Sequence, residues 1–307
     1  MGQAIKTALV SYGMSGKVFH APLLKAYGRF DVVKVMQRSS ETALEIFPEA
    51  SIVRTFDELI NDAEIELVIV NTPDDLHYAQ AKAALEAGKH VVVEKPFVQS
   101  VKQGEELIAL AKAKNLTLTV FHNRRWDNSF LTVQKVLKEN MLGRLVEFEA
   151  RYNRYRTYIQ ESWKEEHQRG TGILHNLGAH LIDAALVLFG MPQGVNARLL
   201  ALRDGSKVDD YFDLRLIYDG LSVTLKAGYL VREETPSYML HGVKGSFLKY
   251  GLDPQEEALK KGEWPAGDDW GKDPEESWGW LNSEVNNFHF KGQAGAHRGP
   301  PEWSGGP

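Results

Sequence analysis

The sequence predicts a two-domain α/β protein, in which a doubly wound parallel sheet is followed by an α+β domain with a large, mostly antiparallel sheet. The chain has 307 residues, which is more than one hydrophobic core comfortably serves. Short apolar runs alternate with helical patterns up to about residue 123, and strict apolar–polar alternation begins after about residue 143. We therefore expect one domain over residues 1–123 and a second over residues 124–290.

The first domain shows strand and helix patterns in turn. Leu67-Val68-Ile69-Val70 and Val91-Val92-Val93 are continuously apolar, as strands covered on both faces must be. Such strands, when they alternate with helices, form a parallel sheet. The expected strands cover residues 7–11, 31–36, 67–72, 90–94 and 117–121, and the helical patterns cover residues 16–27, 77–87 and 101–114.

The second domain shows the period of half-buried strands. Apolar and polar residues alternate over 146–152, 212–218 and 221–227. Asp219-Gly220, between the last two runs, is a hairpin signal. We therefore predict a mostly antiparallel sheet, together with a helix over residues 181–188.

The composition excludes several classes of site and partner. The chain contains no cysteine, which excludes a disulfide framework, a thiolate nucleophile and a cysteine zinc site. A net charge of -5 gives no reason to expect nucleic acid or an anionic membrane as partner. The chain shows no secretory signal and no membrane-spanning apolar run, so we expect a cytoplasmic protein. Residues 291–307 are dense in Gly and Pro, which predicts a disordered tail.

A glycine-rich turn follows the first predicted strand and opens a helix. It is the dinucleotide fingerprint G-x-G-x-x-G with serine at the first position. The second glycine lets the backbone approach a pyrophosphate, the third allows close helix–strand packing, and the helix N-terminus favours the phosphate charge. The expected cofactor contacts come from Ser11, Gly13, Met14, Ser15 and Gly16.

The end of the second strand predicts the form of the cofactor. No carboxylate stands in Met36-Gln37-Arg38-Ser39-Ser40 to bond a ribose 2′-hydroxyl. Arg38 instead supplies a planar cation and Ser39 a hydroxyl, as a 2′-phosphate needs. NADP is therefore the expected cofactor and NAD the alternative, since an exposed turn with a solvated arginine would look the same.

Two further strand ends face the same cofactor. Asn71, Thr72 and Pro73 end one strand, and we place them beside the nicotinamide ribose, with His77 nearby at a helix start. Glu94 and Lys95 end the next strand, at the carboxyl edge where ligands of such sheets bind. A solvated lysine capped by a loop proline is the alternative interpretation of Lys95.

The second domain supplies candidates for proton transfer and substrate binding. His180 precedes an apolar helix, and a histidine suits a group that takes a hydroxyl proton near neutral pH, although a satisfied core histidine is the alternative. Asn176 can orient a hydroxyl but cannot act as a base. We predict no metal site, because no carboxylate–histidine triad is evident. The expected substrate contacts are Asn123, Arg124, Tyr152, Arg154 and Asp183, of which the aromatic and arginine residues could equally form a polar domain interface.

Together these residues resemble the glucose–fructose oxidoreductase/inositol dehydrogenase (Gfo/Idh/MocA) family. The matching pieces are the Gly13/Gly16 turn, Asn71-Thr72-Pro73, Glu94-Lys95-Pro96 and residues 178–183. Five longer segments resemble its NADP-dependent scyllo-inositol dehydrogenase branch, namely residues 12–23, 122–127, 152–156, 210–212 and 249–256. The resemblance covers about residues 5–285.

The resemblance implies a Rossmann domain followed by a domain with an open sheet. The face of that sheet often forms the oligomer contact, so we expect a homo-oligomer, either a dimer or a tetramer. It also implies that Lys95 is the active-site lysine and His180 the acid/base. The position of the family's catalytic aspartate is Asn176 in this chain.

The predicted function is an NADP-dependent oxidoreductase that transfers a hydride between the nicotinamide and a cyclic polyol or sugar. In this hypothesis His180 removes the hydroxyl proton, and the Lys95 ammonium stabilises the negative charge that develops on the substrate oxygen. Asn176 and Asn123 position hydroxyls. A non-catalytic NADP(H)-binding protein of the same fold is the alternative, because Asn176 is uncharged. Redox-assisted glycoside cleavage is a third hypothesis.

Overall fold

The computed structural model describes residues 3–161, 165–166, 170–267, 270–283 and 287–290. The chain forms two compact units. One ends at His122 and also includes Glu256–Gly267, and the other comprises Asn123–Gln255 and the described residues after 269. The predicted limits placed 256–267 in the second domain, and the limits 1–123 and 124–290 stay a prediction. The predicted tail over 291–307 lies outside the described residues.

The first unit is built on a six-stranded sheet in the order β3-β2-β1-β4-β5-β6, with every pair parallel. The doubly wound parallel sheet is therefore confirmed. The strand order reverses between β1 and β4, where ligands of such sheets bind. Among these six strands, only β3 was not predicted from the sequence. The strands are β1 (Ile5–Leu9), β2 (Phe30–Met36), β3 (Ser51–Val53), β4 (Leu67–Val70), β5 (His90–Val93) and β6 (Leu118–Val120).

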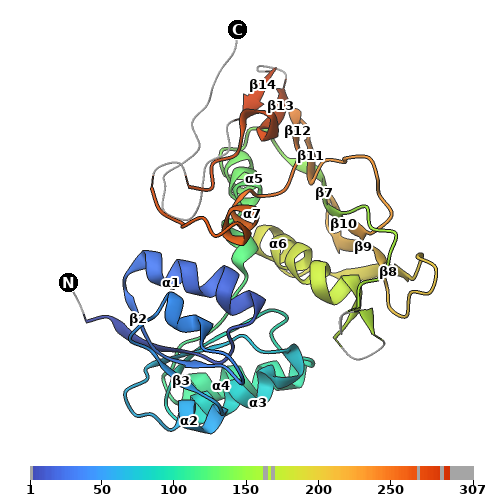
Figure 1. The fold of residues 1–307 in the computed structure, drawn as a ribbon. Helices are drawn as coiled ribbons and strands as arrows, with labels where there is room; N and C mark the ends of the chain where they lie inside the picture. The colour runs from blue at the N-terminus through green and yellow to red at the C-terminus, as the bar shows by residue number, and fades with distance from the viewer. Residues whose placement is uncertain (1–2, 162–164, 167–169, 268–269, 284–286, 291–307) are drawn as a thin grey trace. The chain divides into compact units, whose positions relative to one another are not determined.

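Helices cover both faces of this sheet (Figure 1). Leu9 packs with Leu24 of α1 on one face, whereas Val10, its neighbour in sequence, packs with Leu85 of α3 on the other. This alternation is the reason why the central strands are apolar throughout. The helices are η1 (Ser15–His20), α1 (Ala21–Tyr27), η2 (Thr42–Glu45), α2 (Phe56–Ile60), η3 (Asp74–Leu76), α3 (His77–Glu86) and α4 (Val101–Ala113).

The second unit is built on an eight-stranded sheet in the order β14-β13-β12-β11-β7-β10-β9-β8. Neighbours are antiparallel except for the parallel pair of β7 and β10. The predicted hairpin is present, with Leu221 opposite Tyr218 across the turn. The strands are β7 (Leu145–Asn153), β8 (Gly194–Leu200), β9 (Tyr211–Tyr218), β10 (Leu221–Gly228), β11 (Tyr238–Gly242), β12 (Gly245–Lys249), β13 (Gly279–Ser283) and β14 (Asn287–Phe290).

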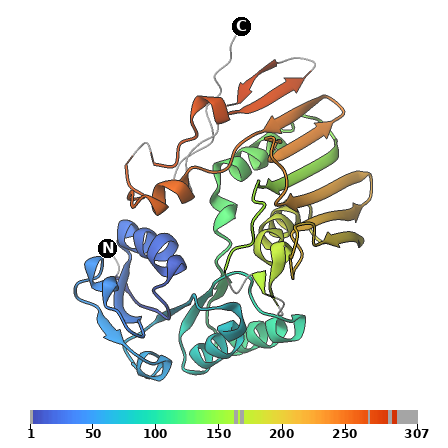
Figure 2. The ribbon, with the colours of Figure 1, turned by 45° about the vertical axis from the view of Figure 1, so that its right-hand side comes forward.

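One face of the larger sheet carries the core of the second unit. Phe130 of α5 (Asn128–Lys138) and Leu181 of α6 (Ala179–Phe189) pack with the inward side chains Phe148, Phe212 and Leu225. Within the described part of this unit, no helix covers the opposite face (Figure 2). The shorter helical elements are η4 (Asn123–Trp126), η6 (Leu174–Gly178), α7 (Gln255–Lys260) and η7 (Glu275–Ser277), with α7 largely in the first unit.

Candidate functional site

The turn after β1 is locked to the end of β4 by a reciprocal amide pair. The backbone N–H of Ser11 donates to Oδ1 of Asn71 (2.8 Å), and Nδ2 of Asn71 donates back to the carbonyl of Ser11 (2.8 Å). The Asn71 side chain therefore joins the ends of β1 and β4, as a further pair of backbone hydrogen bonds between the two strands would. It fixes the glycine-rich turn at the point where the strand order reverses.

The two glycines of the turn serve different needs. A Cβ on Gly16 would lie 2.4 Å from the carbonyl oxygen of Ser11 and 2.9 Å from Nδ2 of Asn71, so only glycine lets helix η1 start this close to the strand. A Cβ on Gly13 would meet only Oγ of Ser11, at 3.7 Å. The fold itself does not require glycine at 13, and the exposed bare backbone there fits the approach of a pyrophosphate.

Glu94 connects this turn to the strand end that carries Lys95. The carboxylate accepts hydrogen bonds from the hydroxyl of Ser15, from Nε2 of His20 (3.0 Å) and from the backbone N–H of Lys95 (3.1 Å). Burial by itself would raise the pKa of Glu94, but the bonds from His20, Ser15 and Lys95 outweigh it and hold that pKa below its usual value. Helix η1 is π-helical, a rare form that is frequent at functional sites.

His77 ties the ends of β4 and β5 together. Its ring is buried, with Nδ1 2.8 Å from the carbonyl oxygen of Pro96 and Nε2 2.9 Å from that of Thr72. A neutral imidazole carries one N–H and donates to one of these oxygens at a time, whereas the doubly protonated ring donates to both. The Thr72 hydroxyl donates to Gln80 (2.6 Å), and exposed Pro73 precedes helix η3.

The loop after β2 presents Arg38 and Ser39 as exposed side chains. Its base is fixed by the buried carboxamide of Gln37, which donates to the hydroxyls of Ser40 (2.7 Å) and Thr42 (3.1 Å). Oε1 of the same residue accepts from the Ala43 N–H, at 2.9 Å. An ordered loop with exposed donors fits the recognition of a 2′-phosphate.

In the second unit, Asn176 lies on the π-helical segment η6, and His180 follows four residues later on α6. Asp209 anchors the start of this helix: its carbonyl accepts from the Ile173 N–H and its carboxylate from the Leu174 N–H, both at 2.8 Å. The carboxylate also explains why residue 172 is glycine. Its φ is +88°, and a Cβ added there would lie 2.2 Å from Oδ1 of Asp209.

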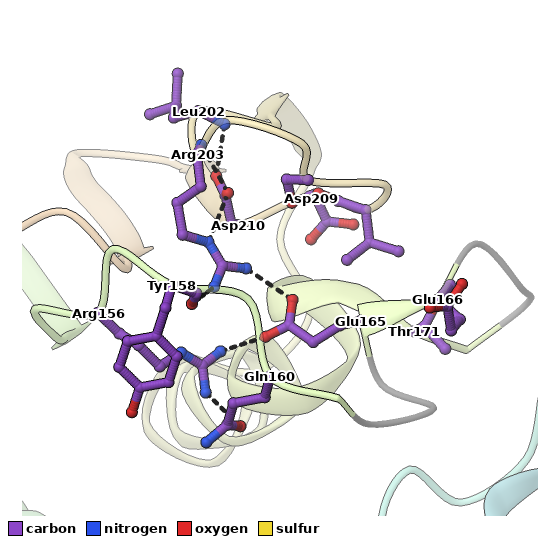
Figure 3. Close-up of polar contacts among 12 residues, drawn as sticks. Arg156, Tyr158, Gln160, Glu165, Glu166, Thr171, Leu202, Arg203, Asp209 and Asp210 are labelled. Carbon is purple, nitrogen blue, oxygen red and sulfur yellow. Dashed lines mark hydrogen bonds and ion pairs between the residues drawn. The ribbon is translucent and has the colours of Figure 1, made fainter.

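A buried ion network continues from the next residue, Asp210 (Figure 3). The carboxylate of Asp210 accepts from Nε of Arg203 (2.9 Å), and Nη2 of Arg203 donates to Glu165 (2.7 Å). Glu165 in turn accepts from Nη2 of Arg156 (2.5 Å). Both guanidinium groups lie over the ring of Tyr229, at 4.1 Å for Arg156 and 4.6 Å for Arg203. The Asp209–Asp210 pair thus fixes both the helix that carries His180 and the loop around residue 160.

The predicted substrate residues of the second unit fall into two groups. Buried Tyr152 packs edge-on against the ring of His180, with centroids 6.4 Å apart, and Arg124 lies 5.8 Å over the Tyr152 ring. Half-buried Asn123 begins η4, just before Arg124. In contrast, Arg154 follows the end of β7 as an exposed residue.

Asp183, one turn after His180, is held by a bidentate ion pair. Nε and Nη2 of Arg125 donate to its two carboxylate oxygens, at 2.8 and 2.6 Å. Such fork-to-carboxylate geometry orients both groups. A substrate hydroxyl that meets Asp183 would therefore meet a carboxylate whose direction is already set.

Sequence reasoning missed several residues that the fold brings to these places. The partner of His20 is 74 residues away and one partner of Glu165 is 38 residues away, and no motif includes Arg54, Glu165 or Arg203. His20 lies within one of the segments that carry the family resemblance, and this is the signal that could have singled it out. Asp209 adjoins another such segment, residues 210–212.

The described residues lack two kinds of feature. No helix there is long and apolar enough to cross a membrane. Over the same residues, no cluster of three or more His, Asp or Glu side chains has an arrangement suited to a metal ion.

Comparison with known proteins defines the class of protein. Residues 5–122 match the oxidoreductase family with the NAD-binding Rossmann fold, and residues 130–248 match the GFO/IDH/MocA C-terminal domain. The chain therefore belongs to the GFO/IDH/MocA family of oxidoreductases, and the family resemblance seen in the sequence is confirmed.

Particular relatives are similar over most of their length. The chain is 44% identical over 279 residues to scyllo-inositol 2-dehydrogenase (NADP(+)) IolW of Bacillus subtilis, covering 91% of this chain and 78% of that protein. It is 43% identical to the uncharacterized oxidoreductase YdgJ of Escherichia coli, covering 89% and 79%. A solved Bacteroides fragilis structure assigned to the oxidoreductases is 50% identical, with a TM-score of 0.88 and coverage of 95% and 86%.

These findings confirm the prediction of an oxidoreductase with a nicotinamide cofactor and the dehydrogenase class. The alternative of a non-catalytic binding protein is not favoured, because the similar proteins are named dehydrogenases and oxidoreductases.

Proposed function

We propose that the protein is an NADP-dependent dehydrogenase that transfers a hydride between the cofactor and a cyclic polyol or sugar of the inositol type. The observation that carries the proposal is the Glu94 carboxylate, which binds the cofactor turn through Ser15 and His20 and also the backbone of Lys95. One side chain thus couples the proposed cofactor turn to the proposed catalytic lysine. The similarity to IolW supports the choice of NADP and of a polyol.

The residues of the first unit fit a dinucleotide. The exposed backbone at Gly13 and the start of η1 would receive the pyrophosphate, and Arg38 with Ser39 would receive the 2′-phosphate. Asn71, Thr72 and Pro73 would lie beside the nicotinamide ribose. When bound, the nicotinamide accepts or returns the hydride.

The chain's own groups would handle the proton and the charge. We assign to His180 the removal of the hydroxyl proton during oxidation, because imidazole titrates near neutral pH. We assign to the Lys95 ammonium the stabilisation of the negative charge that develops on the substrate oxygen. Asn176, in the place of a carboxylate, would orient a hydroxyl through its amide, and Asn123, Arg124, Tyr152 and Asp183 would bind the polyol.

The test is NADP reduction by the purified protein, followed by absorbance of the reduced nicotinamide, with scyllo-inositol, myo-inositol and simple aldoses. We expect turnover to fall by at least about 10²-fold in Lys95→Ala and His180→Ala. Lys102→Ala and His175→Ala are matched controls, since both residues are exposed and neither is assigned a role. Turnover that survives both active-site changes would overturn the assignment. An inert wild-type protein that gains activity in Asn176→Asp would revive the non-catalytic alternative.

We also propose that the protein forms a homo-oligomer through the outer face of its larger sheet. Trp280 and Ile217 on this face are 41% and 51% exposed, and ion pairs between Lys226, Asp213 and Glu149 cross its central strands. Apolar groups among paired charges suit a self-complementary contact. Light scattering should give the mass of a dimer or tetramer, and Ile217→Asp should lower it. A monomeric wild-type protein would contradict this.

A further inference from the structure

Arg54 closes the loop that carries Arg38 and Ser39. Its Nη1 atom donates to two carbonyl oxygens of that loop, Gln37 at 2.8 Å and Ser40 at 2.9 Å. Its Nη2 atom donates to Oε1 of Glu41, at 2.5 Å. A single guanidinium therefore holds both ends of the segment from Gln37 to Ser40. Neither the sequence motifs nor the proposed cofactor contacts include Arg54.

The backbone of Arg54 is itself well positioned. It directly follows β3, whose last residue, Val53, accepts a hydrogen bond from the Gln37 N–H at 3.0 Å. The backbone N–H of Arg54 donates to the carboxylate of Glu58 (3.2 Å). The Thr55 hydroxyl donates to the same carboxylate (2.8 Å) and caps helix α2. Arg54 thus reaches the loop from a rigid strand end, where its guanidinium is kept in place.

The two carbonyl bonds set the direction of the loop's peptide groups. In a trans peptide the C=O and the following N–H point in opposite directions. With the carbonyls of Gln37 and Ser40 turned toward Arg54, the N–H groups of Arg38 and Glu41 point away from it. The loop therefore offers donors on the side opposite Arg54, as recognition of a phosphate group requires.

The pair with Glu41 adds a second effect. Glu41 is the one carboxylate within the loop, and an unpaired negative charge there would repel a phosphate. The side chains of Arg54 and Glu41 are 44% and 58% exposed, so the ion pair alone contributes little. The two bonds to backbone carbonyls should dominate.

We infer that Arg54 is a specificity-determining residue that favours NADP over NAD by holding the Arg38–Ser39 loop in its phosphate-binding form. The inference rests on the proposed function, in which this loop receives the 2′-phosphate. Arg54 acts through the loop and is a positioning residue. It therefore controls the discrimination between the two cofactors and leaves the rest of the dinucleotide site as it is.

The experiment is a fluorescence titration of the purified protein with NADPH and with NADH, which needs no turnover. Arg54→Met should raise the Kd for NADPH about tenfold and that for NADH less than about twofold. Arg54→Lys keeps the positive charge but loses the planar guanidinium with its several donors. Its Kd for NADPH should therefore lie between those of Arg54→Met and the wild type. Arg29→Met is the matched control, since exposed Arg29 precedes the opposite end of β2 and should leave both values unchanged.

Two further variants separate the explanations. Glu41→Gln should not raise the Kd for NADPH. The double variant Arg54→Met/Glu41→Gln should still show most of the rise in that Kd seen in Arg54→Met, because the carbonyls of Gln37 and Ser40 still lack their donor. An unchanged ratio of the two Kd values in Arg54→Met, or full recovery in the double variant, would overturn the inference.

Arg38→Met tests the proposed cofactor site separately. If it lowers the preference for NADPH and Arg54→Met does not, only the role of Arg54 fails. If Arg38→Met leaves the preference unchanged, the proposed 2′-phosphate site fails.

Discussion

Replacement of Asp210 by asparagine should destabilise the second unit more than any surface change in the same region. The carboxylate accepts three hydrogen bonds, from the Leu202 N–H (2.7 Å), the Arg203 N–H (3.0 Å) and Nε of Arg203 (2.9 Å). Asp210 is 1% exposed, and the side chain of Arg203 is fully buried. An asparagine has nearly the same shape, so the change tests charge and hydrogen bonding with little effect on volume.

The magnitude follows from what asparagine cannot do. Its single carbonyl oxygen can accept at one of the two carboxylate positions, so at least one buried donor faces an amide NH₂ group. A buried donor left without an acceptor costs about 1–3 kcal/mol. Arg203 also loses one of its two anionic partners, although Glu165 remains bonded to it. We therefore expect a loss of about 3 kcal/mol in the free energy of unfolding at pH 7, at the lower end of the cost of breaking a buried pair.

The same residue makes an acid-dependent contribution. Burial alone would raise the pKa of Asp210, but the hydrogen bonds from the Leu202 and Arg203 amides and the Arg203 guanidinium lower it below its usual value. A carboxyl whose pKa is lower in the folded state stabilises the fold above its unfolded pKa of about 3.9. That stability is lost as the pH falls through the folded pKa. The deficit of Asp210→Asn should therefore be full at pH 7 and shrink below about pH 4.

Urea unfolding followed by tryptophan fluorescence measures this contribution. All seven tryptophans lie at or beyond Trp126, and of those in the described residues only Trp264 belongs to the first unit. Lys207→Met is the control, because its pair with Glu166 is 59% exposed on both sides and should change stability by less than about 1 kcal/mol. If Asp210→Asn comes within about 1 kcal/mol of the wild type at pH 7, the buried network does not stabilise this unit as argued.

Three further changes test the cofactor turn and the start of the His180 helix. Gly16→Ala should cost about 2 kcal/mol in stability and weaken NADPH binding in the titration, because its Cβ would lie 2.4 Å from a backbone oxygen; normal binding would argue against the close approach. Glu94→Gln should remove an acid-sensitive contribution, since the lowered pKa of Glu94 means that its stabilisation is present above about pH 4.3 and lost below; a melting temperature with unchanged acid dependence would contradict this. Gly172→Ala should cost about 2 kcal/mol more than Gly28→Ala, because both glycines have positive φ but only Gly172 meets a side chain, that of Asp209; equal losses in urea unfolding would show that the contact is unimportant.

The candidate site could be predicted from the sequence where local pattern and ligand chemistry coincide. The turn from Ser11 to Gly16, the strand end at Glu94 and Lys95, and the loop at Arg38 each follow an apolar run, so their place at one edge of a parallel sheet follows from the pattern. Strands with a clear period were found in the same way, whereas β3, β8 and the strands from β11 onward were not predicted.

The sequence by itself determined the parallel and antiparallel halves through their hydrophobic periods, and the oxidoreductase family through motif segments that resemble it, because both are properties of short stretches of chain. Only the tertiary structure decided which distant side chains hold these parts. Glu94 meets Ser15 and His20, Arg54 meets the loop of Arg38, and Arg203 joins Asp210 to Glu165. Buried and half-buried polar groups need hydrogen-bond partners. In this fold those partners come from residues that no local sequence pattern connects.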